Sequence, residues 1–330
     1  MPKIVRFHKT GDAGVLQLDE LPCPTPDAGE VVIDVAAFGL NRAEIMFRQG
    51  DYPQYAPELP SAVGYEAAGT VAAIGEGVSS VAVGDRVSTV PSFKMGPYWT
   101  YGEVALVPEH AVAHYPERLT PTEATAIWMP YMTVYGALIH QAKVSAGDHV
   151  VITAASSSVG IAAIQMVKAV GGIAVATTRG PDKKDFVRSQ GADHVIVTDQ
   201  ENLADRVLNI TDGEGAEFIF DPVAGPQVIE LARAVAYQGT IFVYGRLDPD
   251  PTPFPVNFGL AKGLTMKGYS LFEVINFPDI FEAGKKYVFN GLECGDFNPV
   301  VDRTFPLADV ADAHRHMVSN TQTGKIVVVT

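Results

Sequence analysis

The chain has 330 residues, 47% of them hydrophobic, which is enough to form two domains with substantial cores. Its formal net charge of −14 argues against nucleic acid or an anionic membrane as a partner, because both would repel it. No apolar stretch reaches the length of a membrane span, and the first residues lack the apolar region of a secretory signal. Two cysteines give no disulfide framework, so we expect a cytoplasmic protein.

The first part of the chain, up to about Pro121, favours β-structure. Short β-branched runs at residues 31–37, 69–74 and 85–90 are separated by Gly and Pro, with little helical periodicity. Such runs are typical of an all-β domain, and we predict a partly open barrel.

A strand, a tight turn and a helix are predicted next. Residues 150–154 form a continuous apolar strand, and residues 161–170 form a nearly all-apolar helix, as in elements buried in a parallel sheet. The turn between them places Ala155, Ser157 and Gly160 at the three positions of the G-x-G-x-x-G fingerprint. Two of the three glycines are therefore replaced by small residues.

This turn is a candidate phosphate-binding site. The free N–H groups and the positive dipole end of a helix can hold a pyrophosphate, and serine hydroxyls can donate to phosphate oxygens. The alternative is an ordinary crossover in which the serines only cap the helix. The predicted cofactor-binding residues of this segment are Ser156, Ser157, Ser158, Val159 and Gly160.

The end of the second predicted strand indicates which dinucleotide binds. NAD-specific folds place an acidic residue there to accept a hydrogen bond from the ribose 2′-hydroxyl. This chain instead has Thr178 and Arg179, followed by Lys183. A guanidinium can pair with a 2′-phosphate that a carboxylate would repel, so we predict NADP(H). A solvated basic turn is the alternative.

The alternation of strands and helices then continues. Strands are predicted at residues 194–197, 217–221 and 240–245, and helices at 202–210 and 227–236, as in a doubly wound sheet. Ligands of such sheets bind at the carboxyl ends of strands. Val223, Tyr244 and Gly245 are therefore further candidates for cofactor binding. An amphipathic stretch from about Leu271 and a strand at 325–329 end the chain.

Many weak motifs in a fixed order give the chain a family resemblance. It resembles the medium-chain dehydrogenase/reductase superfamily, and within it the zinc-independent quinone oxidoreductase branch. The motifs are AFGLNRAE, RQGDYP, VGYEAAGTV, GVSSVAVGDRV, YMTVYGAL, FDPVAG, LTMKGYSL and TGKIVVV, together with the dinucleotide segment. The resemblance implies an α/β protein in which a Rossmann-type domain (residues 122–269) is inserted into a GroES-like catalytic domain (residues 1–121 and 270–330).

The resemblance also implies that this chain lacks the catalytic zinc of related alcohol dehydrogenases. Those enzymes place a cysteine in the segment that here reads Gly39-Leu40-Asn41 and a histidine in the segment Gly64-Tyr65-Glu66. Neither ligand is present, and Cys23 and Cys294 are too few and too far apart for a thiolate site. We expect no bound metal.

Without a Lewis acid, reduction of a quinone or an α,β-unsaturated carbonyl is favoured over oxidation of an unactivated alcohol. The candidate hydrogen-bond donors are Asn41, Tyr52 and Tyr65, in segments that by resemblance line the cleft beside the nicotinamide. Tyr52 is the leading proton donor, with a packing role or protonation by water as alternatives. Asn41 would position the nicotinamide ribose or the substrate carbonyl, and Tyr65 would pack or donate a hydrogen bond.

Two further residues are placed near the cofactor by the same resemblance. Thr133 would bond the ribose or carboxamide, unless its hydroxyl only bonds its own helix, and Lys325 would approach the phosphates. A homodimer is expected, paired through the strand near residues 264–269. The predicted activity is NADPH-dependent quinone reduction, with an enone or enal reductase, or a non-catalytic NADPH-binding protein, as alternatives.

Overall fold

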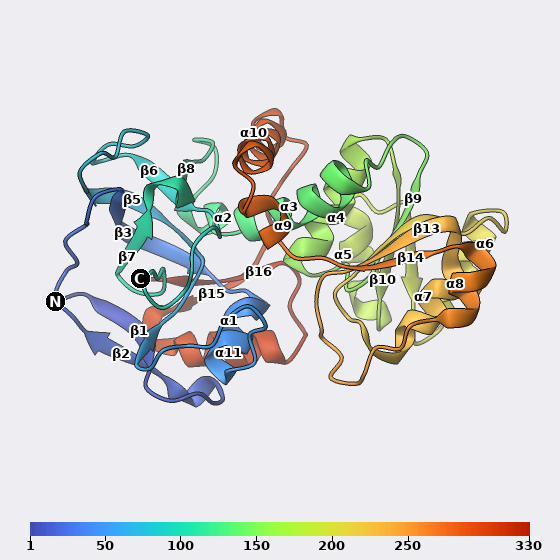
Figure 1. The fold of residues 1–330 in the computed structure, drawn as a ribbon, viewed down its shortest axis with the longest axis horizontal. Helices are drawn as coiled ribbons and strands as arrows, with labels where there is room; N and C mark the ends of the chain where they lie inside the picture. The colour runs from blue at the N-terminus through green and yellow to red at the C-terminus, as the bar shows by residue number, and fades with distance from the viewer. The chain divides into compact units, whose positions relative to one another are not determined.

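The computed structural model describes all residues from Met1 to Thr330. They divide into two compact units. Met1–Met129 and Pro299–Thr330 form the first unit, and Pro130–Asn298 forms the second. Both ends of the chain therefore contribute to the same unit (Figure 1). No helix has both the length and the apolar character needed to cross a membrane.

The first unit is built mainly from β-strands, as predicted. Its larger sheet has the order β15-β16-β3-β5-β6-β8, and β7 pairs with β3 beside this path. The strands are β3 (Glu30–Gly39), β5 (Glu66–Ile74), β6 (Arg86–Thr89), β7 (Val104–Pro108), β8 (Val112–His114), β15 (Val301–Pro306) and β16 (Lys325–Val329). A three-stranded sheet has the order β2 (Leu16–Glu20), β1 (Lys3–Phe7), β4 (Ser61–Ala62).

Short helices connect these strands. They are α1 (Arg42–Gln49), α2 (Pro121–Ala124), α11 (Val310–Val318) and the 3₁₀ turns Ala13–Val15, Glu109–Ala111 and Leu307–Asp309. The pairing of β3 with β5 requires a glycine at position 69, because a Cβ there would lie 1.9 Å from the carbonyl oxygen of Asp34. This close approach coincides with the bulged register of the two strands.

The second unit contains a six-stranded, all-parallel sheet. Its order is β11-β10-β9-β12-β13-β14, so the chain winds outward from β9 in both directions, which confirms the doubly wound arrangement. The strands are β9 (His149–Ile152), β10 (Ile173–Thr178), β11 (His194–Val197), β12 (Ala216–Asp221), β13 (Val235–Val243) and β14 (Thr265–Gly268). Val150, Val151 and Ile152 have no exposed surface, as expected for a central parallel strand.

Helices cover this sheet and extend the unit. They are α4 (Ser158–Ala169), α5 (Lys184–Ser189), α6 (Leu203–Ile210), α7 (Val228–Ala234), α8 (Val256–Lys262), α9 (Phe272–Ile275) and α10 (Pro278–Cys294), with 3₁₀ turns at Pro181–Lys183 and Gly225–Gln227. Helix α3 (Trp128–Val134) contains the boundary between the units and continues into a π-helical segment, Tyr135–Gln141. The helix predicted at 227–236 ends at Ala234, because Val235 is extended and pairs with Ala216.

The unit boundaries differ from the expected division at residues 121 and 270. Residues up to Met129 stay with the first unit, because Trp128 donates to the Ser88 hydroxyl (2.8 Å) and the Met129 N–H donates to Glu66 (2.8 Å). Residues 270–298 lie in the second unit instead of the first, because α10 packs there. The ring of Phe297 stacks on Tyr131, with 5.3 Å between the centroids.

Candidate active site

The turn between β9 and α4 is tight, as the fingerprint predicts. Ala154 has a positive φ of 48°, and the Ala155 N–H donates to the carbonyl oxygen of Thr177 at 3.2 Å. A Cβ on Gly160 would lie 2.6 Å from the backbone of Ala155, so only glycine fits there. The first turn of α4 thus lies directly against the end of the preceding strand.

The N-terminus of α4 has free donors. The Ser157 hydroxyl accepts a hydrogen bond from the Gly160 N–H (3.1 Å), so the capping role that was the alternative is present. The amides of Ser158 and Val159 have no acceptor within the chain, and the side chains of Ser156 and Ser158 are half-buried. Two free N–H groups at the positive end of a 12-residue helix fit a phosphate.

The end of β10 carries the predicted basic residues. Thr178 is buried, and its hydroxyl donates to the Gly180 carbonyl (3.0 Å) instead of pointing to a ligand. Arg179 is exposed and forms no ion pair with any carboxylate of the chain. Lys183 is half-buried at the start of α5. A guanidinium without a carboxylate partner fits the additional phosphate of NADP(H).

The carboxyl ends of β12 and β13 lie at the same edge of the parallel sheet as the carboxyl ends of β9 and β10. Asp221 is buried, and burial raises the pKa of its carboxyl. It accepts hydrogen bonds from the Thr153 hydroxyl and from the backbone N–H groups of Val223 (3.3 Å) and Ala224 (2.7 Å). Asp221 therefore fixes the backbone of the turn in which Val223 lies.

Tyr244 and Gly245 follow β13 at the same edge of the sheet. The ring of Tyr244 stacks on Phe220 at 4.0 Å, and its buried hydroxyl has no hydrogen-bond partner. Gly245 lines a groove of about 380 Å³ together with Val243, Met266 and other residues of this edge. A buried hydroxyl without a partner in the chain keeps its capacity to donate a hydrogen bond. Thr133 is buried in α3 of the same unit.

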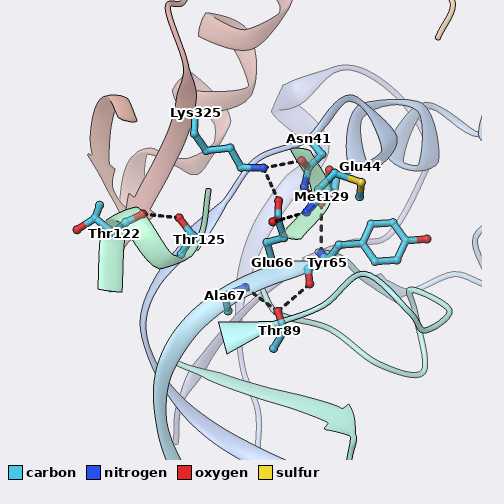
Figure 2. Close-up of polar contacts among 10 residues, drawn as sticks. All are labelled: Asn41, Glu44, Tyr65, Glu66, Ala67, Thr89, Thr122, Thr125, Met129 and Lys325. Atoms are coloured by element: carbon cyan, nitrogen blue, oxygen red, sulfur yellow. Dashed lines mark hydrogen bonds and ion pairs between the residues drawn. The ribbon is translucent and has the colours of Figure 1, made fainter. Parts of the chain in front are cut away.

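The other predicted residues lie in the first unit, where the side chains of Asn41, Glu44, Glu66 and Lys325 form a buried polar network (Figure 2). The ammonium of Lys325 donates to Asn41 Oδ1 (2.5 Å) and to Glu66 Oε2. Asn41 Nδ2 in turn donates to Glu44 Oε1 at 3.0 Å. The network connects β16, the start of α1 and the start of β5.

Lys325 does not fit the role of a phosphate contact. Its side chain is 1% exposed and is held by Glu66, which is equally buried. An ammonium in this position cannot turn toward an external anion without leaving a buried carboxylate unpaired. Asn41 likewise forms hydrogen bonds through both its amide oxygen and its amide nitrogen, to Lys325 and to Glu44.

Glu44 is the unusual member of the network. Its Oε1 accepts from Asn41 and from the Tyr65 N–H (3.2 Å), whereas Oε2 has no partner. Complete burial raises the pKa of this carboxyl from its usual value of 4.5 to about 7, against the opposing effects of Asn41 and Lys325. Glu44 therefore exchanges its proton near neutral pH.

Tyr65 belongs to a cluster of three phenols. Its hydroxyl lies 3.2 Å from that of Tyr52 and 2.6 Å from that of Tyr55, and Tyr55 also accepts from the Met95 N–H (2.9 Å). Burial raises the pKa of all three hydroxyls above 10, so each keeps its proton at neutral pH. The structure thus brings the candidate donors Tyr52 and Tyr65 into contact with each other.

Three residues of this region were not predicted from the sequence. Tyr55 lies three residues after Tyr52 in the same Pro-containing turn, and Glu44 lies three residues after Asn41 in the first turn of α1. The i, i+3 spacing of Asn41 and Glu44 at the start of a helix was available as a signal, whereas Tyr52 and Tyr55 lie outside any helix and their spacing gives no such signal. Glu66 directly follows Tyr65, and only its contact with Lys325, 259 residues away, reveals its role.

The segments in which, by the family resemblance, related dehydrogenases carry zinc ligands contain Asn41 and Tyr65, and neither is a side chain that zinc favours. No three or more His, Cys, Asp or Glu side chains of the chain are grouped so that they could hold a metal ion.

The raised pKa of Glu44 gives a prediction for stability. A carboxyl whose pKa is higher in the folded state contributes stability that is fully present below pH 4.5 and is lost as the pH rises through about 7. Relative to Glu44→Gln, the wild-type protein should lose about 2 kcal/mol of unfolding free energy between pH 5.5 and 8. Urea denaturation at both pH values measures this difference, with the exposed Glu76→Gln as a control. Parallel pH profiles for wild type and Glu44→Gln would contradict it.

Two family models match the chain. The alcohol dehydrogenase GroES-like domain matches residues 27–117, and the model described as zinc-binding dehydrogenase matches residues 158–286. The first match lies within the β-rich unit, and the second lies within the unit that contains the parallel sheet.

Curated relatives match over nearly the whole chain. Human quinone oxidoreductase is 30% identical, covering 99% of this chain and 97% of the human protein. Quinone oxidoreductase from Pseudomonas aeruginosa is also 30% identical, with both chains covered completely.

Solved structures agree with these relatives. Quinone oxidoreductase from Pseudomonas syringae pv. tomato aligns with a TM-score of 0.91 at 27% identity, with 100% of each chain covered. The Escherichia coli quinone oxidoreductase, crystallised in complex with NADPH, aligns with a TM-score of 0.90 at 26% identity, covering 99% of this chain and 100% of that one. With its Rossmann-type and GroES-like units and these relatives, the chain belongs to the quinone oxidoreductase branch of the medium-chain dehydrogenase/reductase superfamily.

Proposed function

We propose that this protein is an NADPH-dependent oxidoreductase that reduces quinones without zinc. The observation that carries the proposal is the hydrogen-bonded phenol cluster of Tyr52, Tyr55 and Tyr65, in which Tyr65 stands where, by the family resemblance, zinc-dependent relatives carry a ligand histidine. A quinone needs a hydride at an electron-poor position and a proton at its oxygen, and phenols can hold and protonate that oxygen.

The second unit offers a site for NADP(H). The amides of Ser158 and Val159 and the hydroxyls of Ser156 and Ser158 would hold the pyrophosphate, and Arg179, with Lys183 close to it in sequence, would hold the 2′-phosphate. The unpaired Tyr244 hydroxyl, the Val223 turn and Gly245 would contact the remainder of the dinucleotide. When bound, the reduced nicotinamide supplies the hydride. The complexes of related enzymes with NADPH support this assignment.

The first unit supplies the proton donor and the residues that hold the donor in position. We assign Tyr52 as the group that donates a hydrogen bond and then a proton to the substrate oxygen, since its hydroxyl lies at the end of the phenol cluster and contacts only the Tyr65 hydroxyl. Asn41, Glu66 and Lys325 hold the start of α1 and of β5 in place, and Tyr65 lies directly before β5. Their role is structural support, with no contact to substrate required.

Arg179 is predicted to determine the preference for NADPH. Arg179→Glu should weaken NADPH binding far more than NADH binding, because it removes a cation and adds a charge that repels the 2′-phosphate. We expect a loss of about 2 kcal/mol, or roughly 30-fold, in the NADPH-over-NADH ratio of kcat/KM. Fluorescence titration with each cofactor gives the same comparison without turnover. Lys286→Glu, an equal charge change at an exposed position of α10, should leave the ratio unchanged. Equal losses for both cofactors would remove Arg179 from the phosphate site.

Tyr52→Phe is predicted to lower kcat for quinones by about 10²-fold with little change in KM, because the ring remains and only the proton donor is lost. The measurement uses a panel of quinones, alkenals and a simple alcohol with NADPH. Tyr115→Phe is the matched control, since its hydroxyl bonds Arg86 in the same unit (3.3 Å). An unchanged rate for Tyr52→Phe would assign the proton to water. Turnover of alkenals but not quinones would replace the proposed substrate class.

A homodimer through the edge of the parallel sheet is also proposed. Strand β14 pairs only with β13, and the neighbouring helix α8 exposes Leu260 (85%) and Val256 (55%). A free strand edge beside exposed apolar side chains is suited to pairing with a second copy. Leu260→Glu should shift the protein toward monomer in light scattering at micromolar concentration, whereas Val83→Glu, an exposed apolar position in the other unit, should not. A monomeric wild type would contradict the proposal.

A further inference from the structure

The three phenol oxygens form a row with Tyr65 at its centre. Tyr65 Oη contacts Tyr55 Oη on one side (2.6 Å) and Tyr52 Oη on the other (3.2 Å), and the Tyr65 side chain is almost fully buried. A phenol has a single proton. Tyr65 can therefore donate only one of these hydrogen bonds, and if it accepted both, its own buried proton would have no acceptor. It donates one and accepts the other, so the row has a direction.

The Met95 amide selects that direction. Its N–H donates to Tyr55 Oη at 2.9 Å, and a backbone N–H can only donate. If Tyr65 also donated to Tyr55, Tyr55 would accept two hydrogen bonds, and the bond from the Met95 N–H would oppose the direction of the row. If Tyr55 donates to Tyr65 and Tyr65 to Tyr52, every bond runs head to tail. Each bond then strengthens the next.

We infer that Tyr55 and Tyr65 are a proton relay that aims the Tyr52 proton at the substrate and replaces it after transfer; this inference rests on the proposed function. In the head-to-tail arrangement the Tyr52 hydroxyl accepts from Tyr65 and keeps its own proton free for an outside acceptor. Neither Tyr55 nor Tyr65 touches the substrate. Both act through Tyr52 as positioning residues.

The proton balance is simple. The substrate receives a hydride, with its electron pair, from a reduced nicotinamide, and its oxygen takes the proton from Tyr52 Oη as that O–H bond breaks. Tyr65 then passes its proton to Tyr52, Tyr55 passes its proton to Tyr65, and Tyr55 takes a proton from water. All three phenols end in their starting state, and no further oxidant or reductant is needed.

Tyr55 is suited to be the outer end of the relay. It is only partly buried, and the ammonium of Lys94 lies 5.3 Å from its ring centroid. The Lys94 side chain is itself half exposed. A cation over the ring and the Met95 N–H at the oxygen both favour transient negative charge on this phenol.

The direction of the hydroxyls can be tested without turnover. Neutron diffraction from crystals of the cofactor-free protein, exchanged into D₂O, locates the deuterium on each phenol oxygen. We expect the Tyr55 deuterium to point at Tyr65 Oη and the Tyr65 deuterium at Tyr52 Oη. A Tyr65 deuterium directed at Tyr55 would overturn the inference, whatever the activity of the protein.

Kinetics test whether the relay acts through Tyr52. Tyr55→Phe and Tyr65→Phe should each lower the single-turnover rate with a quinone by about 10-fold, with KM unchanged. The double variant Tyr52→Phe/Tyr55→Phe should be no slower than Tyr52→Phe, because without the Tyr52 hydroxyl there is no group for the relay to reprotonate. The wild-type rate should depend on the deuterium fraction of the solvent along a curve, and that of Tyr55→Phe along a straight line. Tyr115→Phe should behave as wild type.

The outcomes separate this inference from the proposed function. Multiplied losses in the double variant, with a straight proton inventory in the wild type, would show independent structural effects and overturn the relay alone. Absence of wild-type turnover with every quinone and alkenal would overturn the proposed function, and the neutron map would still decide the direction of the hydroxyls.

Discussion

A buried ion pair between Lys325 and Glu66 holds the first unit together at the site. It joins β16, near the end of the chain, to β5, near its beginning. Two charges removed from water are costly unless further hydrogen bonds satisfy them. Here Asn41 accepts from the ammonium, and the Met129 N–H donates to the other carboxylate oxygen of Glu66. The pair therefore fixes the mutual positions of four segments, and loss of one partner would leave a buried charge at a cost of about 3–5 kcal/mol.

The position of the phenol cluster depends on the buried network of Asn41, Glu44, Glu66 and Lys325. Tyr65 directly precedes Glu66, and its N–H is held by Glu44, which is in turn held by Asn41 (Figure 2). On the other side, the Thr89 hydroxyl donates to the Tyr65 carbonyl and accepts from the Ala67 N–H, both at 2.8 Å. The backbone of Tyr65 is thus fixed on both sides. Its hydroxyl can then serve as the centre of a row of hydrogen bonds.

The second unit works by a different principle. The edge of its sheet that we propose for cofactor binding is formed mostly by backbone groups and by small residues, which the local pattern of the sequence specifies. A glycine five residues after Ala155, a serine before the helix and the absence of an acid after β10 could all be identified in the sequence, and the structure places them as the pattern indicates. Thr178 is an exception, because its hydroxyl turns back to Gly180. A local sequence pattern indicates where a side chain starts, whereas its hydrogen-bond partner is decided by the surrounding packing.

The sequence by itself determined the class of fold, the doubly wound order of strands and helices, and the absence of a cysteine and a histidine from the segments of Asn41 and Tyr65. These follow from periodicities and turn residues that act over a few positions along the chain. Only the tertiary structure decided that Lys325 is sealed against Glu66 rather than free for a phosphate, that residues 270–298 pack with the parallel sheet, and that Tyr55 completes the phenol row. The first two findings depend on contacts between segments far apart in the sequence, and the third depends on where one hydroxyl points. A local sequence pattern encodes neither the contacts nor the hydroxyl direction.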